Sequence, residues 1–227
     1  MIQIFARASR ATSIVACSAA AALPAAHAAV VIDFEPAALT GLYFPGETFT
    51  QQGFTLAVGP DFGTIDTAAA IGIGAPTGNS SQFYFNSNDG TLTLSQSGGL
   101  AFSLGGFAAA FVPLSPASNQ NTVIVATGTT QANTQVSAFW SFAPSATSNF
   151  PFMTYGGAGF AAFTNLVQLQ FKACSLVAGV ACTVATNNNG QFALDDVVLT
   201  VVPEPGTWLM LATGLLGLGA VARRARR

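Results

Sequence analysis

The sequence predicts an all-β domain, a β-sandwich or jelly roll, over residues 29–200. Three observations predict it. Many short segments rich in β-branched and aromatic residues follow one another closely, and glycine, asparagine and serine turns separate them. No segment in this range carries a persuasive apolar period of 3.6 residues, which a helix would need. Most of the 19 phenylalanines lie in the predicted strands and would supply the core of one two-layer domain.

Six stretches supply the predicted strands. In chain order they are Val30–Glu35, Gln82–Ser95, Leu100–Val112, Thr122–Phe142, Asn165–Cys174 and Gln191–Val202. The second stretch alternates on either side of Asn88-Asp89-Gly90 and predicts a hairpin, and the third predicts two strands broken at Gly105-Gly106. The fourth predicts two strands around a turn of glycine, threonine and asparagine.

Side-chain alternation assigns faces to the last two stretches, because neighbouring residues of a strand point to opposite sides. Phe192, Leu194 and Asp196 share one side of the last strand. In the strand before it, one face holds Leu166, Gln168 and Gln170, and the other holds Val167, Leu169 and Phe171.

Residues 1–28 have the parts of a secretory signal peptide, which would be helical before its removal. Arg7 and Arg10 form a basic region, Ala11–Ala26 forms an apolar one, and Ala26-His27-Ala28 fits the small-x-small rule of signal peptidase. We therefore expect cleavage after Ala28. The alternative is a lipoprotein signal at Ile14–Cys17, but only a few apolar residues would then separate its cysteine from the basic region.

The C-terminal residues predict a membrane anchor. Residues 206–222 are apolar apart from two threonines, and as a transmembrane helix they would span about 25 Å. The cluster Arg223, Arg224, Arg226 and Arg227 follows, and basic residues beside a span stay on the cytoplasmic side. We therefore expect the tail to stop in the inner membrane with the body of the protein outside the cytoplasm.

Val202-Pro203-Glu204-Pro205 precedes the anchor. The two prolines fix φ and remove backbone donors, so the segment should be extended and exposed outside the membrane. Together with the short span and the terminal arginines, residues 201–227 resemble the PEP-CTERM sorting tail of Gram-negative bacteria. The resemblance implies that an exosortase-type membrane peptidase recognises the motif and releases or transfers the protein to the cell surface or beyond. It also implies an association with exopolysaccharide and biofilm.

The segment FALDDVVL, Phe192–Leu199, carries a second and shorter resemblance. It is similar to the closing strand of jelly-roll carbohydrate-binding modules and of other exported PEP-CTERM proteins, and the opening Asp33-Phe34-Glu35 is similar to their first strand. The resemblance favours a jelly roll over an immunoglobulin-like sandwich.

Export determines which cysteines remain in the mature protein and whether they can form a disulfide. Cys17 leaves with the signal peptide, so Cys174 and Cys182 remain as an even pair in an oxidising compartment. The seven residues between them allow a loop to bring the two thiols together. We therefore expect a disulfide between Cys174 and Cys182, which would stabilise the domain by about 2–3 kcal/mol.

Composition excludes several functional classes. His27, the single histidine, leaves with the signal, which removes Ser-His-Asp, Cys-His and histidine-ligated zinc sites. Residues 29–202 hold eight acids and one base, Lys172, and a net charge of −7 argues against nucleic acid as a partner. We therefore expect a protein that is not an enzyme.

Aspartate and glutamate are the residues that remain for a metal site or a catalytic site. If the first and last strands lie close together, Asp33, Glu35, Asp195 and Asp196 would meet and offer oxygen ligands to a structural calcium ion. The alternative is that these acids are solvated or bind strand-end amides. A glycosidase pair is a further alternative: one of the two adjacent aspartates would work with Glu35, Glu47 or Asp61 across a cleft.

Sugar binding would need exposed aromatic rings beside amides. Tyr84, Trp140 and Tyr155 are the candidate ligand contacts, and Trp140 has the core as its alternative place because Phe139 and Phe142 flank it. Tyr43 and Phe44 in an early loop are further candidates. We expect an exported surface or matrix protein that binds exopolysaccharide, and the alternative is a passive structural or adhesive protein acting through protein contacts.

Overall fold

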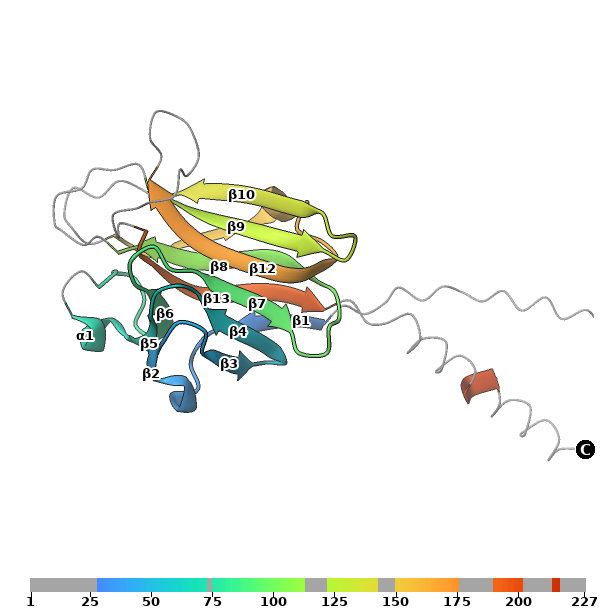
Figure 1. Cartoon of the computed structure of the whole chain (residues 1–227), viewed down its shortest axis with the longest axis horizontal. Helices are drawn as coiled ribbons and strands as arrows, with labels where there is room; N and C mark the ends of the chain where they lie inside the picture. Colours follow the sequence, from blue (N-terminus) through green and yellow to red (C-terminus); the bar gives the residue numbers. More distant parts are fainter. Residues whose placement is uncertain are drawn as a thin grey trace, which may run out of the picture.

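The computed structural model describes residues 28–72, 75–112, 122–142, 150–175, 190–201 and 214–216. Thirteen strands within these ranges form one nearly closed sheet, which confirms the all-β prediction (Figure 1). The strands are β1 (Ala28–Ile32), β2 (Gly41–Tyr43), β3 (Thr48–Gln51), β4 (Phe54–Val58), β5 (Gly63–Thr67), β6 (Gln82–Asn86), β7 (Leu92–Gln96), β8 (Phe102–Phe111), β9 (Thr122–Thr130), β10 (Gln135–Ser141), β11 (Met153–Gly156), β12 (Leu166–Ser175) and β13 (Phe192–Val201). Between the strands lie three short helical segments, η1 (Ala37–Leu39), α1 (Ala68–Ile71) and η2 (Gly157–Phe160).

The strands pair antiparallel and form two halves of the sheet. The first half has the order β2-β5-β6-β13-β8-β11, with β1 paired to the C-terminal part of β13. The second half has the order β3-β4-β7-β12-β9-β10. One residue pair, Leu166 of β12 with Phe102 of β8, joins the halves. The sheet is therefore continuous.

A phenylalanine-rich core lies between the two halves. Phe54 of β4 packs edge-on against Phe102 of β8 with ring centroids 5.2 Å apart, and Phe107 of β8 packs against Phe171 of β12 at 5.1 Å. All four rings are buried. Burying one such ring stabilises a fold by about 1.5–3 kcal/mol, so these contacts hold the two halves together across the core.

Aromatic contacts also close the sheet on both sides. Tyr43 of β2 and Phe49 of β3 come from the two ends of the sheet, and their ring centroids lie 4.8 Å apart. On the other side Trp140 of β10 faces Tyr155 of β11 at 6.3 Å, and the Tyr155 hydroxyl donates a hydrogen bond to the Ser141 carbonyl at 3.3 Å. Side-chain contacts therefore link strands whose backbones do not pair.

The predicted hairpin around Asn88-Asp89-Gly90 is wrong. Strands flank this turn as expected, but β6 pairs with β5 and β13 whereas β7 pairs with β4 and β12. The turn therefore carries the chain from the first half to the second. Polar contacts within the protein hold it, since Asn88 Nδ2 donates to Asp61 Oδ1 at 3.0 Å and the Gly190 N–H donates to Asp89 Oδ1 at 2.8 Å.

The predicted break at Gly105-Gly106 is also wrong, because β8 runs through both glycines. A β-carbon on Gly106 would lie 2.7 Å from the Tyr155 carbonyl oxygen, closer than real β-carbons come. The glycine therefore lets β11 approach β8 rather than ending the strand. The predicted two strands in Thr122–Phe142 are present as β9 and β10.

A bulge in β13 changes the predicted faces of the last strand. The register with β8 shifts between Asp195 and Val198, and Asp196 has a φ of 46°. Phe192 and Leu194 face the core before the bulge, and Val197 and Leu199 face it afterwards. Asp196 is therefore exposed instead of sharing a side with Phe192. A similar shift in β12 places Leu166 on the buried side, away from Gln168 and Gln170.

The predictions for the two ends of the chain fall largely outside the described residues. The signal peptide, Val202-Pro203-Glu204-Pro205, the arginine cluster and most of the anchor lie there. Residues 214–216 form a helical turn. Within the described ranges, no helix has both the length and the apolar character needed to cross a bilayer.

Candidate functional site

Tyr84 lies in the core, so the prediction that it contacts a ligand is wrong. Its side chain is fully buried against Phe34 and Phe192, and its hydroxyl donates to Asn86 Oδ1 at 3.1 Å. Burial raises the pKa of the Tyr84 phenol well above its usual value. Gly63 sits directly against this ring, which leaves no room for a ligand on that side.

Trp140 and Tyr155 lie together at the closed edge between β10 and β11. Both are half-buried. Trp140 stacks on Phe160 with centroids 4.8 Å apart and rings 13° from parallel, and it packs edge-on against the buried Phe107 at 5.1 Å. Burial raises the pKa of Tyr155 to about 12. These contacts favour the alternative that Trp140 belongs to the core.

The four acids of the predicted calcium site lie near the pairing of β1 with β13. Ile32 is opposite Val197, so Asp33 follows β1 close to the bulge of β13. The Asp33 carboxylate accepts hydrogen bonds from Gln51 Nε2 and from the Glu35 backbone N–H. The calcium prediction depended on the first and last strands lying close together, and they do, because β1 pairs with β13.

Asp195 is the buried member of this group, with 3% of its surface exposed. Its Oδ2 accepts hydrogen bonds from Asn79 Nδ2 at 2.6 Å and Ser81 Oγ at 3.4 Å, and its Oδ1 accepts one from the Asp196 N–H at 2.8 Å. Burial raises the pKa of Asp195 to about 7. The hydrogen bonds from Asn79 and Asp196 lower this pKa, and the charges of Asp196 and Glu35 raise it.

The acids do not assemble the predicted calcium site. Across the described ranges, no group of three or more histidine, cysteine, aspartate or glutamate side chains could hold a metal ion. The physical reason is the bulge: Asp195 turns into the protein beneath Asn79, Asp196 is exposed, and Asp33 is bound to Gln51. Because Asp195 is buried, its carboxyl is also poorly placed to meet a polysaccharide as a glycosidase acid.

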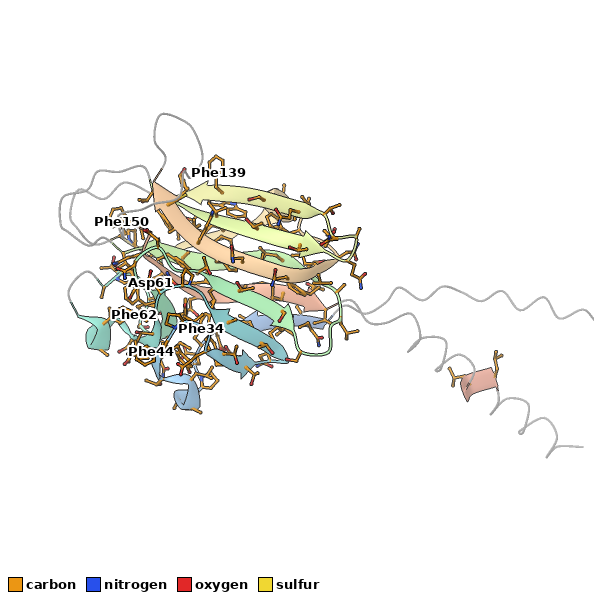
Figure 2. The ribbon with its side chains drawn as sticks, in the orientation of Figure 1. Phe34, Phe44, Asp61, Phe62, Phe139 and Phe150 are labelled. Atoms are coloured by element: carbon orange, nitrogen blue, oxygen red, sulfur yellow. The ribbon has the colours of Figure 1, made fainter. Side chains whose placement is uncertain are left out.

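The sheet presents a pair of exposed aromatic rings where β2 ends and β5 begins. Tyr43 pairs with Gly63, so the next residues, Phe44 and Phe62, flank this pair at the end of the ladder. Phe44 is 57% exposed and Phe62 is 40% exposed. Figure 2 shows both rings and Asp61 at the same end of the molecule. We call the two rings the Phe44–Phe62 pair.

Polar groups hold the Phe44–Phe62 pair in place. The Phe44 N–H donates to Glu47 Oε2 at 2.8 Å, and the Phe62 carbonyl accepts from the Ser87 N–H at 3.0 Å. Asn88 Nδ2 donates to Asp61 next to Phe62. The turns that carry the two apolar rings thus also hold two carboxylates and an amide, the combination of aromatic rings and polar groups that sugar binding needs.

Phe62 could not be paired with Phe44 from the sequence. The two residues are 18 positions apart, and the β2–β5 pairing that joins them spans an intervening pair of strands, β3 and β4. Tyr43, which was predicted as a contact beside Phe44, instead packs its ring on Phe49. A usable signal was the pair of short Phe-Pro and Pro-Asp-Phe segments, each next to a turn.

Cys174 forms a disulfide in the structure. Its predicted partner Cys182 lies outside the described residues, so the pairing of these two cysteines stays a prediction.

Comparisons with known proteins identify the tail. Residues 201–227 match the family model of the PEP-CTERM protein-sorting motif. No curated protein matches the sequence. Among solved structures, the enzymatically active domain of bacteriophage CBA120 tailspike protein 4 gives a TM-score of 0.32 at 16% identity, over 66% of this chain and 20% of that one. A likeness this weak establishes neither a shared fold nor a shared activity. The sorting motif implies an exported protein that is anchored in the membrane and then processed by an exosortase.

Proposed function

We propose that this PEP-CTERM-tailed protein is a non-enzymatic component of the cell surface or extracellular matrix that binds exopolysaccharide through the Phe44–Phe62 pair. Signal peptidase removes residues 1–28, and the tail holds the body outside the inner membrane until an exosortase-type peptidase cuts near Pro203-Glu204-Pro205. The single observation that supports sugar binding is the exposed ring pair with its polar border.

Aromatic rings suit a sugar because one face of a pyranose ring is made of C–H groups. Such a face can lie on a phenylalanine ring and bury apolar area on both sides, at about 25 cal/mol per Å². Phe44 is 57% exposed, so its ring keeps most of its surface available. Isolated exposed phenylalanines are ordinary, but here two exposed rings flank the same end of the β2–β5 ladder.

The polar border supplies the second part of sugar recognition. Hydroxyl groups at the rim of a pyranose ring need hydrogen-bond partners when they leave water. Asp61 and Glu47 offer carboxylate oxygens, and Asn88 offers an amide, all within the turns that carry the rings. Because these side chains are already hydrogen-bonded within the protein, little conformational freedom is lost when a sugar binds.

Affinity electrophoresis of the secreted protein tests the proposal. The gels contain hydroxyethyl cellulose, dextran, mannan or alginate, or the exopolysaccharide isolated from the producing culture. We expect the double variant Phe44→Ala/Phe62→Ala to bind at least ten-fold more weakly than the wild type. Met153→Ala is the control, because Met153 is 38% exposed on β11, at the other end of the first half from β2. Equal loss in both variants, or no retardation of the wild type by any polysaccharide, would contradict the proposal.

A passive adhesive role is the second candidate, and the position of Phe44 directly after the edge strand β2 favours it. Leu42 is 51% exposed on β2, at the end of the sheet, two residues before Phe44. A protein partner or a second copy would cover this apolar edge. Sedimentation of the purified protein distinguishes the two functions, because concentration-dependent assembly that Leu42→Ser abolishes, without any sugar binding, would support the adhesive role.

A further inference from the structure

The outer face of the second half carries two rows of side chains. The first row is Thr48, Ala57, Thr93, Gln170, Thr127 and Ser137, which are paired from strand to strand. The second row holds two paired sets, Thr50, Thr55 and Ser95 of β3, β4 and β7, and Gln168, Thr129 and Gln135 of β12, β9 and β10. We call these residues the threonine-rich face. Every member except Ala57 is an uncharged side chain with a hydrogen-bonding group.

These side chains point away from the core. Along β3, β4, β7 and β12 they alternate with buried residues, among them Phe49, Leu56, Leu94 and Leu169, and on β10 they alternate with half-buried residues such as Val136. Within the first row, Thr127 and Ser137 share a hydrogen bond between hydroxyls at 3.2 Å, and Gln170 Nε2 donates to Thr93 Oγ1 at 3.3 Å. Neighbouring strands lie about 4.8 Å apart, so the rows present hydroxyl and amide groups at regular intervals across six strands.

The threonine-rich face is also free of charge. None of the eight acids of residues 29–202 belongs to the two rows. Lys172 lies two residues after Gln170 on β12, so it borders the face without being part of it. A charged group must shed its water before a ligand covers it, which is costly without a partner of opposite charge. A surface without charges can be covered by an uncharged ligand at much lower cost.

We propose that the threonine-rich face is a second binding surface, which takes an extended uncharged polysaccharide chain, so that one molecule cross-links two chains. This inference rests on the proposed function. The hydroxyls of such a chain are donors and acceptors at once, as are those of threonine and serine, and the glutamine amide offers both. A chain lying across the strands meets a hydrogen-bonding group at nearly every strand, and β-branching restricts χ1 of the threonines before any ligand binds.

The position of the face makes cross-linking possible. The two halves of the sheet pack core to core, so their outer faces point in different directions. The Phe44–Phe62 pair lies on the first half and the threonine-rich face on the second. Two chains bound to one molecule would therefore not occupy the same space, and joining them raises the overall avidity without further contacts.

Two other occupants fit the observations less well. A rigid lattice such as ice needs a flat surface, but antiparallel sheets twist, and β12 is visibly curved in Figure 1. A flexible chain can follow that curvature. A protein partner would need buried aromatic or aliphatic anchors, and the two rows contain none.

The test compares isosteric charge changes on and off the face in the secreted protein. Gln168→Glu/Gln170→Glu puts two charges into the rows, and Gln52→Glu/Gln131→Glu puts the same charges at two exposed turns outside them. Binding is measured by affinity electrophoresis in hydroxyethyl cellulose, dextran, mannan and alginate. Cross-linking is measured as the viscosity that the protein adds to each polysaccharide solution.

We expect the wild type to raise the viscosity of at least one uncharged polysaccharide. Gln168→Glu/Gln170→Glu should abolish that rise and weaken binding at least three-fold, whereas Gln52→Glu/Gln131→Glu should behave as the wild type. Phe44→Ala/Phe62→Ala should also abolish the viscosity rise but keep residual binding.

Three results would overturn the inference. Polysaccharide binding with no viscosity rise and no effect of Gln168→Glu/Gln170→Glu would refute the second surface and leave the proposed function standing. A wild type that binds no polysaccharide would refute both. Inhibition of ice growth that is lost in Gln168→Glu/Gln170→Glu would assign the face to a rigid lattice instead.

Discussion

The Asn79 side-chain amide donates a hydrogen bond of 2.6 Å to the Asp195 carboxyl, although the two residues lie 116 positions apart in the sequence. The bond ties the segment before β6 to the bulge of the last strand. Because Asp195 is buried there beside the charges of Asp196 and Glu35, its protonation should govern the stability of this part of the fold.

Stability should fall as the pH rises from about 4 to about 7. The pKa of Asp195 is about 7 in the folded protein against an ordinary value of 3.8, so in this interval the folded state keeps a proton that the unfolded chain has lost. The expected decrease in the free energy of unfolding is on the order of 2–4 kcal/mol. Urea unfolding across this pH range measures it. Asp195→Asn should flatten the profile, and Asp196→Asn, at the exposed neighbour, should not.

Gly106→Ala should destabilise the domain by about 1–3 kcal/mol, because the new methyl group would press on the Tyr155 carbonyl of β11. Gly105→Ala is the control. A β-carbon there would come no closer than 3.5 Å to Val198, an ordinary contact, so a change below about 1 kcal/mol is expected. Equal losses in thermal unfolding would show that β11 does not press against β8 as described.

Trp140→Ala should cost about 3–5 kcal/mol of stability, because the indole packs on Phe107 and Phe160. Phe139→Ala, at the exposed neighbouring position, should change stability by less than about 0.5 kcal/mol. Polysaccharide affinity of the folded Trp140→Ala protein should equal that of the wild type. A selective loss of affinity would restore Trp140 as a ligand contact.

Removal of the disulfide should lower the free energy of unfolding by about 2–3 kcal/mol, since the loop between Cys174 and Cys182 is short. Cys174→Ala/Cys182→Ala and the reduced wild type should unfold at the same urea concentration. The single variants Cys174→Ala and Cys182→Ala should each lose as much stability as the double variant, and a single variant as stable as the wild type would contradict this pairing.

Chelation of divalent ions should leave the thermal unfolding midpoint unchanged, because Asp33, Glu35, Asp195 and Asp196 do not assemble a metal site among the described residues. Added calcium should likewise have no effect. A rise in the midpoint with calcium that Asp196→Asn abolishes would revive the site predicted from the sequence.

Local signals in the sequence predicted the strands but not how they pair. Alternating apolar residues located β6, β7, β12 and β13, because burial of one face leaves a period of two, and the turn of glycine, threonine and asparagine located β9 and β10 on either side of it. The Asn88-Asp89-Gly90 turn looked like a hairpin because the same residue types also suit a turn that crosses between layers. Short strands such as β2 and β11 carry too few residues for any period to show.

The candidate site was less predictable than the fold because it depends on register. One extra residue in β13 forms a bulge that determines which side of the sheet Asp195 and Asp196 face. No pattern in the sequence marks that bulge. Only the β2–β5 pairing brings Phe44 and Phe62 to the same end of the sheet. The sorting tail, in contrast, was identified from contiguous residues, and the family comparison confirms it.

The most direct test of the central claim is an NMR titration of the mature protein, with the aromatic rings labelled with carbon-13, against the exopolysaccharide of the producing culture. The account predicts saturable shifts of the Phe44 and Phe62 ring signals, with the buried Tyr84 ring unaffected. Saturable binding that leaves both phenylalanine rings unperturbed would contradict it.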